Sequence, residues 1–200
     1  MGAVLSEAAA RGAEVSVLCF THGESSTLGT GREPLHQVRR EEFEEAAGVL
    51  GLRSPLMLDY PDGRLPAVDL EELAQHVIAA ARRSGADSLL AFDLGGVTGH
   101  PDHHRATEAA LAAADRLDLA VSGWAVPDDV AEALNSELGT RFSGRPAEGL
   151  TARLEVDRSV QHKAIACHVS QCRSNPVLWR RLELQGGREY LVPLRAASSG

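Results

Sequence analysis

Residues 88–104 read Ser88-Leu-Leu-Ala-Phe-Asp-Leu-Gly-Gly-Val-Thr-Gly-His-Pro-Asp-His-His104. The apolar run at the start of this stretch predicts a buried strand. A glycine-rich loop follows, and Pro101 suits the first turn of a helix. We therefore expect a strand, a loop and a helix that runs to about Ala114. A strand that leads through a loop into a helix is the repeating unit of α/β folds with a parallel sheet.

The same alternation of apolar and amphipathic segments extends in both directions from this unit, which predicts a Rossmann-like, mainly parallel sheet with helices on both faces. At 200 residues the chain suits one domain, which we place at residues 1–195, with a frayed tail at Ala196–Gly200. The expected helices are Val4–Ala10, Leu35–Leu50, Val68–Arg83 and Ser159–Cys172. The other expected strands are Glu14–Phe20, Leu56–Leu58, Leu119–Val126, Leu150–Val156 and Glu189–Val192, and a polar loop is expected at Thr21–Glu33.

Composition excludes several classes of function. The net charge is −8, the isoelectric point is near 5.5 and there is no long run of Lys or Arg, so neither nucleic acid nor an anionic membrane is the expected partner. No stretch approaches the roughly 18 apolar residues of a membrane span, and the start of the sequence does not resemble a signal peptide. Three cysteines do not imply a disulfide framework. We expect a cytoplasmic protein whose partner is a small molecule.

Polar side chains follow the predicted strands at the places where ligands bind in open α/β sheets, beyond the carboxyl ends of the strands. Carboxylates and imidazoles gathered at one edge suit a metal site or an acid/base pair. The first strand is followed by His22 and Glu24, the second by Asp59 and Asp62, and the third by Asp93, His100, Asp102, His103 and His104.

The sequence Gly99-His-Pro-Asp-His103 is the strongest of these signals. His100 and His103 are three residues apart at a helix start, so both imidazoles can serve one site. A catalytic zinc takes three protein ligands and a water, whose pKa it lowers to about 7. Asp102 could orient one imidazole, and Asp93 could form the opposite wall.

Several of these side chains also suit ordinary structural roles. Glu24 and Asp62 lie in Gly-Glu-Ser and Pro-Asp-Gly sequences that are equally typical of plain turns. Arg39 on an amphipathic helix is typical of a solvated face, and His104 alone is typical of a capping or surface residue. We assign ordinary roles to His22, His36, His76 and His162 and leave the role of His168 open.

Short motifs spread along the chain together resemble the LmbE-like (PIG-L) family of zinc-dependent N-deacetylases. They occur in the family's order from Gly2 to about Gln171. They are the run Ala10–Val17, Thr21-His-Gly-Glu24, Arg39-Arg-Glu-Glu-Phe43 with Ala46-Ala47 and Leu50-Gly51, Tyr60-Pro-Asp-Gly63, Gly99-His-Pro-Asp-His103, and Lys163 with His168-Val-Ser-Gln171.

The resemblance implies a role for each matching residue. His103 would bind zinc, and His100, with Asp102 as its partner, would be the catalytic imidazole that polarises the amide carbonyl. The positions that contact the sugar in the family correspond to Glu24, Arg39 and Asp62. Thr98 stands where some relatives carry a tyrosine near the oxyanion, so a phenol contribution is not expected here.

The family opens with a strand followed by His-Pro-Asp-Asp-Glu, whose His and second Asp bind zinc and whose first Asp is the general base. Gly2 matches the second glycine after that motif, so we expect an LmbE-like fold without its first strand, in which His103 is the family zinc ligand that remains. A late start codon, a shortened form of a longer protein or a genuine loss would each give this beginning, and the coding sequence upstream of Met1 separates them. Unpaired edges beside that strand would make this chain less stable than a form extended upstream.

The resemblance therefore implies a zinc-dependent hydrolase that removes the acetyl group from an N-acetylated amino sugar, such as an N-acetylglucosamine derivative, or from a related small-molecule amide. The oligomeric state, including a homo-oligomer, stays open. One alternative is a non-catalytic relative that keeps the sugar contacts of Glu24, Arg39 and Asp62 without tight metal binding. The other is a different hydrolase that uses Asp93, His100 and His103 with a metal of its own.

Overall fold

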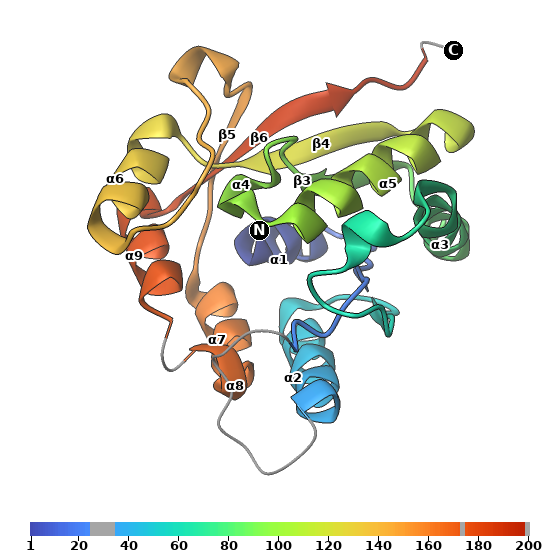
Figure 1. Ribbon diagram of the computed structural model, residues 1–200, viewed down its shortest axis with the longest axis horizontal. Helices are drawn as coiled ribbons and strands as arrows, with labels where there is room; N and C mark the ends of the chain where they lie inside the picture. The colour runs from blue at the N-terminus through green and yellow to red at the C-terminus, as the bar shows by residue number, and fades with distance from the viewer. Residues whose placement is uncertain (25–34, 173–174, 199–200) are drawn as a thin grey trace. The chain divides into compact units, whose positions relative to one another are not determined.

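The computed structural model describes residues 1–24, 35–172 and 175–198, which form two compact units. The first unit consists of Met1–Asp62 and Glu155–Arg188, and the second consists of Gly63–Leu154 and Glu189–Gly200. Figure 1 colours the chain from its N-terminus to its C-terminus. Residues 25–33 of the predicted polar loop and the last two residues of the predicted frayed tail lie outside the described part of the chain.

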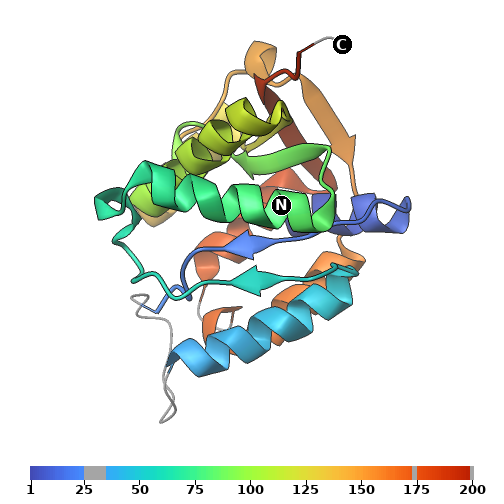
Figure 2. The ribbon, with the colours of Figure 1, turned by 90° about the vertical axis from the view of Figure 1, so that its right-hand side faces the viewer.

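The first unit combines a short parallel strand pair with helices. The strands β1 (Leu18–Cys19) and β2 (Leu56–Met57) run in the same direction, with Leu18 opposite Leu56 (Figure 2). The helices α1, α2 and α7 pack on one another. The helices of this unit are α1 (Gly2–Ala10), α2 (Leu35–Leu50), α7 (Ser159–Cys167), α8 (Val169–Cys172) and α9 (Pro176–Gln185).

The second unit contains a sheet of four strands in the order β3-β4-β6-β5. These are β3 (Ser88–Phe92), β4 (Ala120–Ala125), β6 (Arg188–Arg195) and β5 (Ala152–Glu155). The pair β3–β4 is parallel and the pair β4–β6 is antiparallel, so this sheet is mixed. The helices of the unit are α3 (Leu70–Ser84), α4 (Gly96–Gly99), α5 (Pro101–Leu117) and α6 (Asp128–Leu138), with single 3₁₀ turns at Leu65–Ala67 and Ala147–Gly149.

Small side chains allow α3 and α5 to lie side by side in the second unit (Figure 1). The buried face of α5 carries Ala109, Ala110, Ala113 and Ala114 at the three- and four-residue spacing of one helix face. On α3 the buried face is larger and is built from Leu73, Ala74, Val77, Ile78 and Ala81. Burial of these two faces supplies much of the apolar core of the unit.

The sequence predictions for the α/β fold are confirmed, and two elements, α2 and β3, have the predicted bounds. Three details are wrong. The strand predicted at Glu14–Phe20 is paired over Leu18–Cys19 alone. The helix predicted at Ser159–Cys172 breaks at His168, whose ψ of 58° is not helical. The segments that hold α6 and α9 have no regular structure in the prediction.

The open edges of the sheets bear on the predicted stability difference. Among the residues that the structure describes, β1 pairs with β2 and β3 pairs with β4, and neither β1 nor β3 has a strand on its other side. Such edges leave backbone N–H and C=O groups without ladder partners. We keep the prediction that a form extended upstream is more stable than this chain, which a higher denaturation midpoint of the extended form would show.

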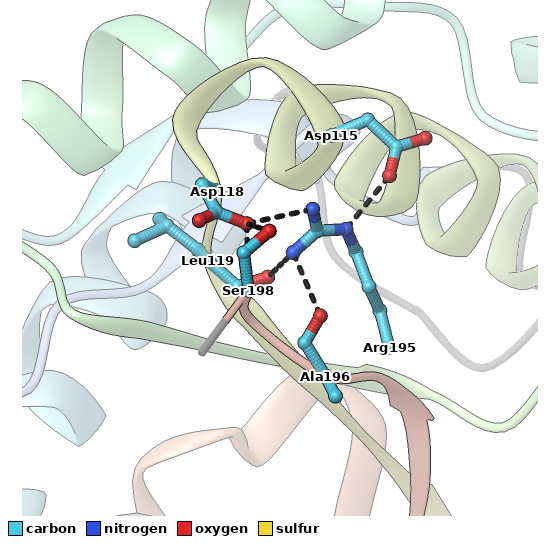
Figure 3. A network of polar contacts seen from close by, with 6 residues as sticks. All are labelled: Asp115, Asp118, Leu119, Arg195, Ala196 and Ser198. Carbon is cyan, nitrogen blue, oxygen red and sulfur yellow. Dashed lines mark hydrogen bonds and ion pairs between the residues drawn. The ribbon is translucent and has the colours of Figure 1, made fainter. Parts of the chain in front are cut away.

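The end of β6 is tied to the end of α5 by a polar network (Figure 3). Arg195 Nε donates to Asp115 at 2.7 Å, Nη2 donates to Asp118 at 3.0 Å and Nη1 donates to the carbonyl of Leu119 at 2.6 Å. The backbone N–H of Ser198 donates to the same Asp118 oxygen at 3.0 Å. These bonds to Ser198 and Arg195 lower the pKa of Asp118. Ser198 belongs to the segment that was expected to fray, and it is held by this network.

The helices and the cysteines can be compared with the expectations from composition. No helix in the described ranges is both long enough and apolar enough to cross a membrane. Cys19, Cys167 and Cys172 are free thiols, and desolvation raises the pKa of the Cys19 thiol to about 11.

Candidate active site

The loop between β3 and α5, in the second unit, has a strained backbone. Val97 is fully buried with a φ of 59°, a conformation that is unusual for a β-branched residue. Gly99 has a φ of 69°, and a Cβ atom there would lie 2.7 Å from the carbonyl oxygen of Arg141. Strain of this kind persists where the surrounding structure enforces it, and it is frequent at functional sites.

His100 forms the N-cap of α5. Its Nδ1 accepts a hydrogen bond of 3.2 Å from the backbone N–H of Asp102, and Pro101 occupies the first helical position. Because Nδ1 accepts, the proton of the neutral imidazole is assigned to Nε2. The His100 side chain is exposed, so this N–H can reach a ligand.

His103 is held on two sides. Its ring stacks on Phe92 with centroids 4.0 Å apart and an interplanar angle of 8°. Its Nδ1 lies 2.9 Å from the hydroxyl of Thr98. If that hydroxyl accepts from Nδ1, the lone pair of His103 is on Nε2, which is the arrangement of a metal-binding histidine with an outer partner. The centroids of the His100 and His103 rings are 5.2 Å apart, so the two predicted imidazoles do come together.

The carboxylate of Asp102 has a different partner from the one predicted. It is buried, and its two oxygens accept from the backbone N–H groups of Gly63 at 2.7 Å and Leu65 at 3.2 Å. The contact with His100 is made by the backbone of Asp102. The expectation that the Asp102 carboxylate orients an imidazole is therefore wrong for this structure. The carboxylate instead fixes the residues that follow Asp62 in the sequence.

Asp93 forms an ion pair. It is 2 % exposed, and Arg145 donates to its two oxygens from Nε at 2.7 Å and from Nη2 at 2.8 Å. These hydrogen bonds raise the pKa of Arg145. An aspartate engaged in this way is a poor metal ligand or base, which disfavours the alternative hydrolase built on Asp93. His104 lies at the surface near Glu108, as predicted.

The first unit brings together the three residues predicted to contact a sugar. Arg39 is 3 % exposed, so the solvated-face interpretation is wrong. Its Nη1 donates to the carbonyl of Gly23 at 2.7 Å. Burial lowers the pKa of Arg39, and the charges of Glu42, Asp62 and Glu24 oppose that shift.

Glu24 and Asp62 are linked directly. The Oε1 of Glu24 accepts from the backbone N–H of Asp62 at 2.8 Å, and the Thr21 hydroxyl donates to Asp62 at 3.4 Å. The other oxygen of Glu24 is buried and has no hydrogen-bond partner within the described ranges. The neighbouring His22 is buried, and its Nε2 lies 2.8 Å from Oδ1 of Asp59, which fits the ordinary role assigned to His22.

Sequence reasoning missed the partners that surround Arg39. Glu42, three residues later on the same face of α2, accepts from the N–H and the hydroxyl of Ser170, both at 2.7 Å. Burial lowers the pKa of His168, an effect that Glu42 opposes and Arg39 reinforces. The signal that could have found these residues was the motif His168–Gln171, to which the resemblance assigned no role.

The described residues do not complete a zinc site. They contain no group of three or more His, Cys, Asp or Glu side chains placed to hold a metal ion. The oxygens of Asp102 and Asp93 are engaged by backbone N–H groups and by Arg145. These residues by themselves therefore do not fit a catalytic zinc, which needs about three protein ligands.

Gly23 is required by the approach of Arg39. Its φ is 67°, and a Cβ atom there would lie 2.8 Å from Arg39 Nη1. We expect Gly23→Ala to lower the free energy of unfolding by about 2 kcal/mol, half from the left-handed conformation and half from the clash. Gly85→Ala is the matched control, because its φ is 64° with no atom within 4 Å. Equal losses in urea denaturation would show that Arg39 does not need the space at Gly23.

Solved structures of other proteins have a similar fold. A deacetylase of the teicoplanin biosynthetic pathway has a TM-score of 0.71 and 19 % identity, with 100 % of this chain and 93 % of that chain covered. The N,N'-diacetylchitobiose deacetylase of Pyrococcus horikoshii has a TM-score of 0.71 and 22 % identity, covering 97 % and 78 %. The 4-carboxy-2-hydroxymuconate hydratase of Pseudomonas putida has a TM-score of 0.71 and 17 % identity, covering 100 % and 91 %. The chain has the α/β fold of LmbE-like deacetylases.

The family follows from the sequence match. The family described as PIG-L, GlcNAc-PI de-N-acetylase, matches residues 1–114, and the chain belongs to it, as the resemblance predicted. The matched range contains Glu24, Arg39, Asp62 and the loop that ends at His103.

Two curated relatives are similar over part of their length. A probable N-acetylglucosaminyl-phosphatidylinositol de-N-acetylase of Schizosaccharomyces pombe is 29 % identical over 98 residues, which is 48 % of this chain and 38 % of the relative. A 1D-myo-inositol 2-acetamido-2-deoxy-α-D-glucopyranoside deacetylase of Catenulispora acidiphila is 30 % identical over 139 residues, which is 57 % of this chain and 43 % of the relative. The chain thus spans about two fifths of the length of these relatives.

Proposed function

We propose that this protein hydrolyses the N-acetyl group of an N-acetylated amino sugar, or of a related small-molecule amide, and releases acetate and a free amine. The observation that carries the proposal is the pair His100 and His103 at the start of α5, whose ring centroids are 5.2 Å apart. Both residues lie inside the segment that matches the family. The two curated relatives are named as de-N-acetylases of N-acetylglucosamine compounds, which supports the same substrate class.

In this proposal His100 is the catalytic imidazole. With Nδ1 engaged by the N–H of Asp102, its Nε2–H is free to donate to the acetyl oxygen as negative charge develops there. The same group can pass a proton to the leaving amine. Asp102 contributes by its backbone N–H and by holding Gly63 and Leu65.

Zinc is the cofactor that we propose, with His103 as the ligand that this chain supplies. Thr98 at Nδ1 would set the ring so that Nε2 faces the ion. The described residues do not supply the other ligands, and we assign no step of the reaction to the metal. Zinc binding measured by competition with a chromophoric chelator should weaken in His103→Ala.

Glu24, Arg39 and Asp62 are the proposed sugar contacts. A sugar hydroxyl can donate to the unused oxygen of Glu24 and accept from Nη2 of Arg39, since each lacks a hydrogen-bond partner among the described residues.

A cytoplasmic location and a homo-oligomeric state are kept as proposals.

The second candidate function is a non-catalytic sugar-binding protein. It is favoured by the lack of a metal-holding group in the described ranges, while Glu24, Arg39 and Asp62 are brought together in the first unit. Saturation-transfer NMR with N-acetylglucosaminyl-inositol, followed over time, separates the two functions. Binding without new acetate would support this candidate, and binding with acetate release would exclude it.

The substrate class is tested by measuring free amine with a fluorogenic reagent. We expect amine from N-acetylglucosaminyl-inositol or N,N'-diacetylchitobiose, and none from an N-acetylated amino acid that lacks the sugar hydroxyls. Release from the amino acid derivative alone would contradict the assignment of Glu24, Arg39 and Asp62 as sugar contacts.

A further inference from the structure

The helix α8 lies against α2 in the first unit, and neither the mechanism nor the sugar contacts use its side chains. In the orientation that its neighbours require, the carboxamide of Gln171 accepts from Arg39 twice. Its oxygen lies 2.6 Å from Nη1 and 3.1 Å from Nε. One amide oxygen therefore bridges two nitrogens of the buried guanidinium.

Ser170 fixes α8 at this place. Its backbone N–H and its hydroxyl both donate to Glu42 at 2.7 Å. Glu42 is one helical turn from Arg39, so consecutive residues of α8 bind two side chains on the same face of α2. The carboxylate of Glu42 anchors the backbone, and the uncharged Gln171 engages the guanidinium.

The donors of Arg39 can be counted. A guanidinium has five N–H donors. Nε points to Gln171, and Nη1 serves Gln171 and the carbonyl of Gly23. Nη2 is buried and has no hydrogen-bond partner within the described ranges. The protein thus secures one edge of the guanidinium and leaves Nη2 for a ligand.

The chemistry of Gln171 suits this task. A carboxylate at this position would orient the guanidinium equally well but would neutralise its charge with a direct ion pair. A carboxamide supplies the same acceptor without a charge. Three acidic side chains, Glu42, Asp62 and Glu24, already lie near Arg39, and Gln171 adds no further negative charge.

We propose that Gln171 is a positioning residue, which holds the Arg39 guanidinium so that Nη2 faces the substrate. This inference rests on the proposed function in one respect, namely that Arg39 contacts the substrate. Loss of a hydrogen bond to a charged group corresponds to roughly a tenfold or larger change in affinity. Because a sugar contact of this kind acts in the ground state and the transition state alike, KM should change and kcat should not.

The kinetic test compares two variants of Gln171. We expect Gln171→Leu, which keeps the shape and removes the acceptor, to raise KM about tenfold with kcat within twofold. Gln171→Glu keeps an acceptor but adds a negative charge, so its KM should lie between the KM values of Gln171→Leu and the unmodified protein. In a double-mutant cycle, Gln171→Leu should add nothing to Arg39→Ala, because Gln171 acts through Arg39. Additive effects, or equal KM values for Gln171→Leu and the unmodified protein, would overturn the proposal.

A second readout does not depend on turnover. The Nε–H signal of Arg39 in ¹⁵N-resolved NMR should exchange slowly with water in the unmodified protein and in Gln171→Glu. It should exchange at least tenfold faster in Gln171→Leu. If exchange is unchanged in Gln171→Leu, the positioning role is wrong. If exchange changes as expected and no N-acetylated sugar is hydrolysed, the positioning role stands and the proposed function fails.

A matched control comes from α9. The oxygen of Gln185 accepts from Nη1 of Arg181 at 2.6 Å, and both side chains are buried. Gln185→Leu removes the same kind of bond away from Arg39. It should leave the Arg39 signal and KM unchanged while lowering the unfolding midpoint about as much as Gln171→Leu. A change in the Arg39 signal of this control would show that general loosening, not loss of the Gln171 acceptor, is responsible.

Discussion

Replacement of His100 by alanine should lower kcat for N-acetyl hydrolysis by roughly 10²–10⁴-fold, the usual contribution of a positioned acid/base group. The expected loss comes from the Nε2–H of His100, which the N-cap geometry leaves free to donate to the developing oxyanion. KM should change much less, because this contact is strongest in the transition state. The measurement is a steady-state acetate assay on the product of the complete open reading frame.

His104→Ala is the matched control for this prediction. His104 lies on the same helix turn, but its side chain is 53 % exposed and sits near Glu108. Its loss should change kcat less than twofold. Similar effects of the two replacements would show that the first turn of α5, not the His100 imidazole, is what the reaction needs.

Arg145→Ala should lower the free energy of unfolding by about 3 kcal/mol, because it leaves the buried Asp93 carboxylate without its partner. We take the low end of the usual range since the Arg145 side chain is 37 % exposed.

The control for the ion pair is Arg141→Ala, which removes an exposed arginine from the same segment. Its effect should stay within about 0.5 kcal/mol. Urea denaturation at neutral pH measures the unmodified protein and both variants. A loss in Arg145→Ala no larger than the loss in Arg141→Ala would show that the Asp93 pair does not stabilise the fold.

Local periodicity was enough to predict the elements that carry the site. The buried residues of α2 recur at the spacing of one helix face and Gly51 follows its last residue, so its predicted range is the observed one. The strand β3 is a continuous apolar run. The capping role of His100 also follows locally, from Pro101 and the start of an alanine-rich helix.

Other features depend on residues that are distant in the sequence. Asp102 was matched with its neighbour His100, but its carboxylate accepts from Gly63 and Leu65, almost forty residues away. Arg39 lies in a strongly charged stretch that reads as solvated, and it is buried because Gly23 and Gln171 supply acceptors. Tertiary partners of this kind override local preference.

The helices α6 and α9 were missed although their end signals are present. Two aspartates lie in the first turn of α6 and Gly139 ends it in a left-handed conformation. Asn175 caps α9, and Pro176 occupies its first position. These signals were available from the sequence, so this part of the fold was predictable.

The fold alone does not determine the chemistry. A hydratase and two deacetylases have the same TM-score against this chain, at identities of 17 %, 19 % and 22 %. Function must therefore be argued from the side chains at the site. The relevant side chains here are His100 and His103, at the N-cap and in the first turn of α5, and the buried Arg39.

The most direct test is a proton NMR time course of the product of the complete open reading frame with N-acetylglucosaminyl-inositol and zinc. We expect the acetate methyl signal and the free-amine sugar signals to grow together in a one-to-one ratio, and both to be lost in His103→Ala. If the sugar binds and no acetate forms, or if acetate forms equally fast in His103→Ala, the assignment of this protein as an N-deacetylase that works through this loop is contradicted.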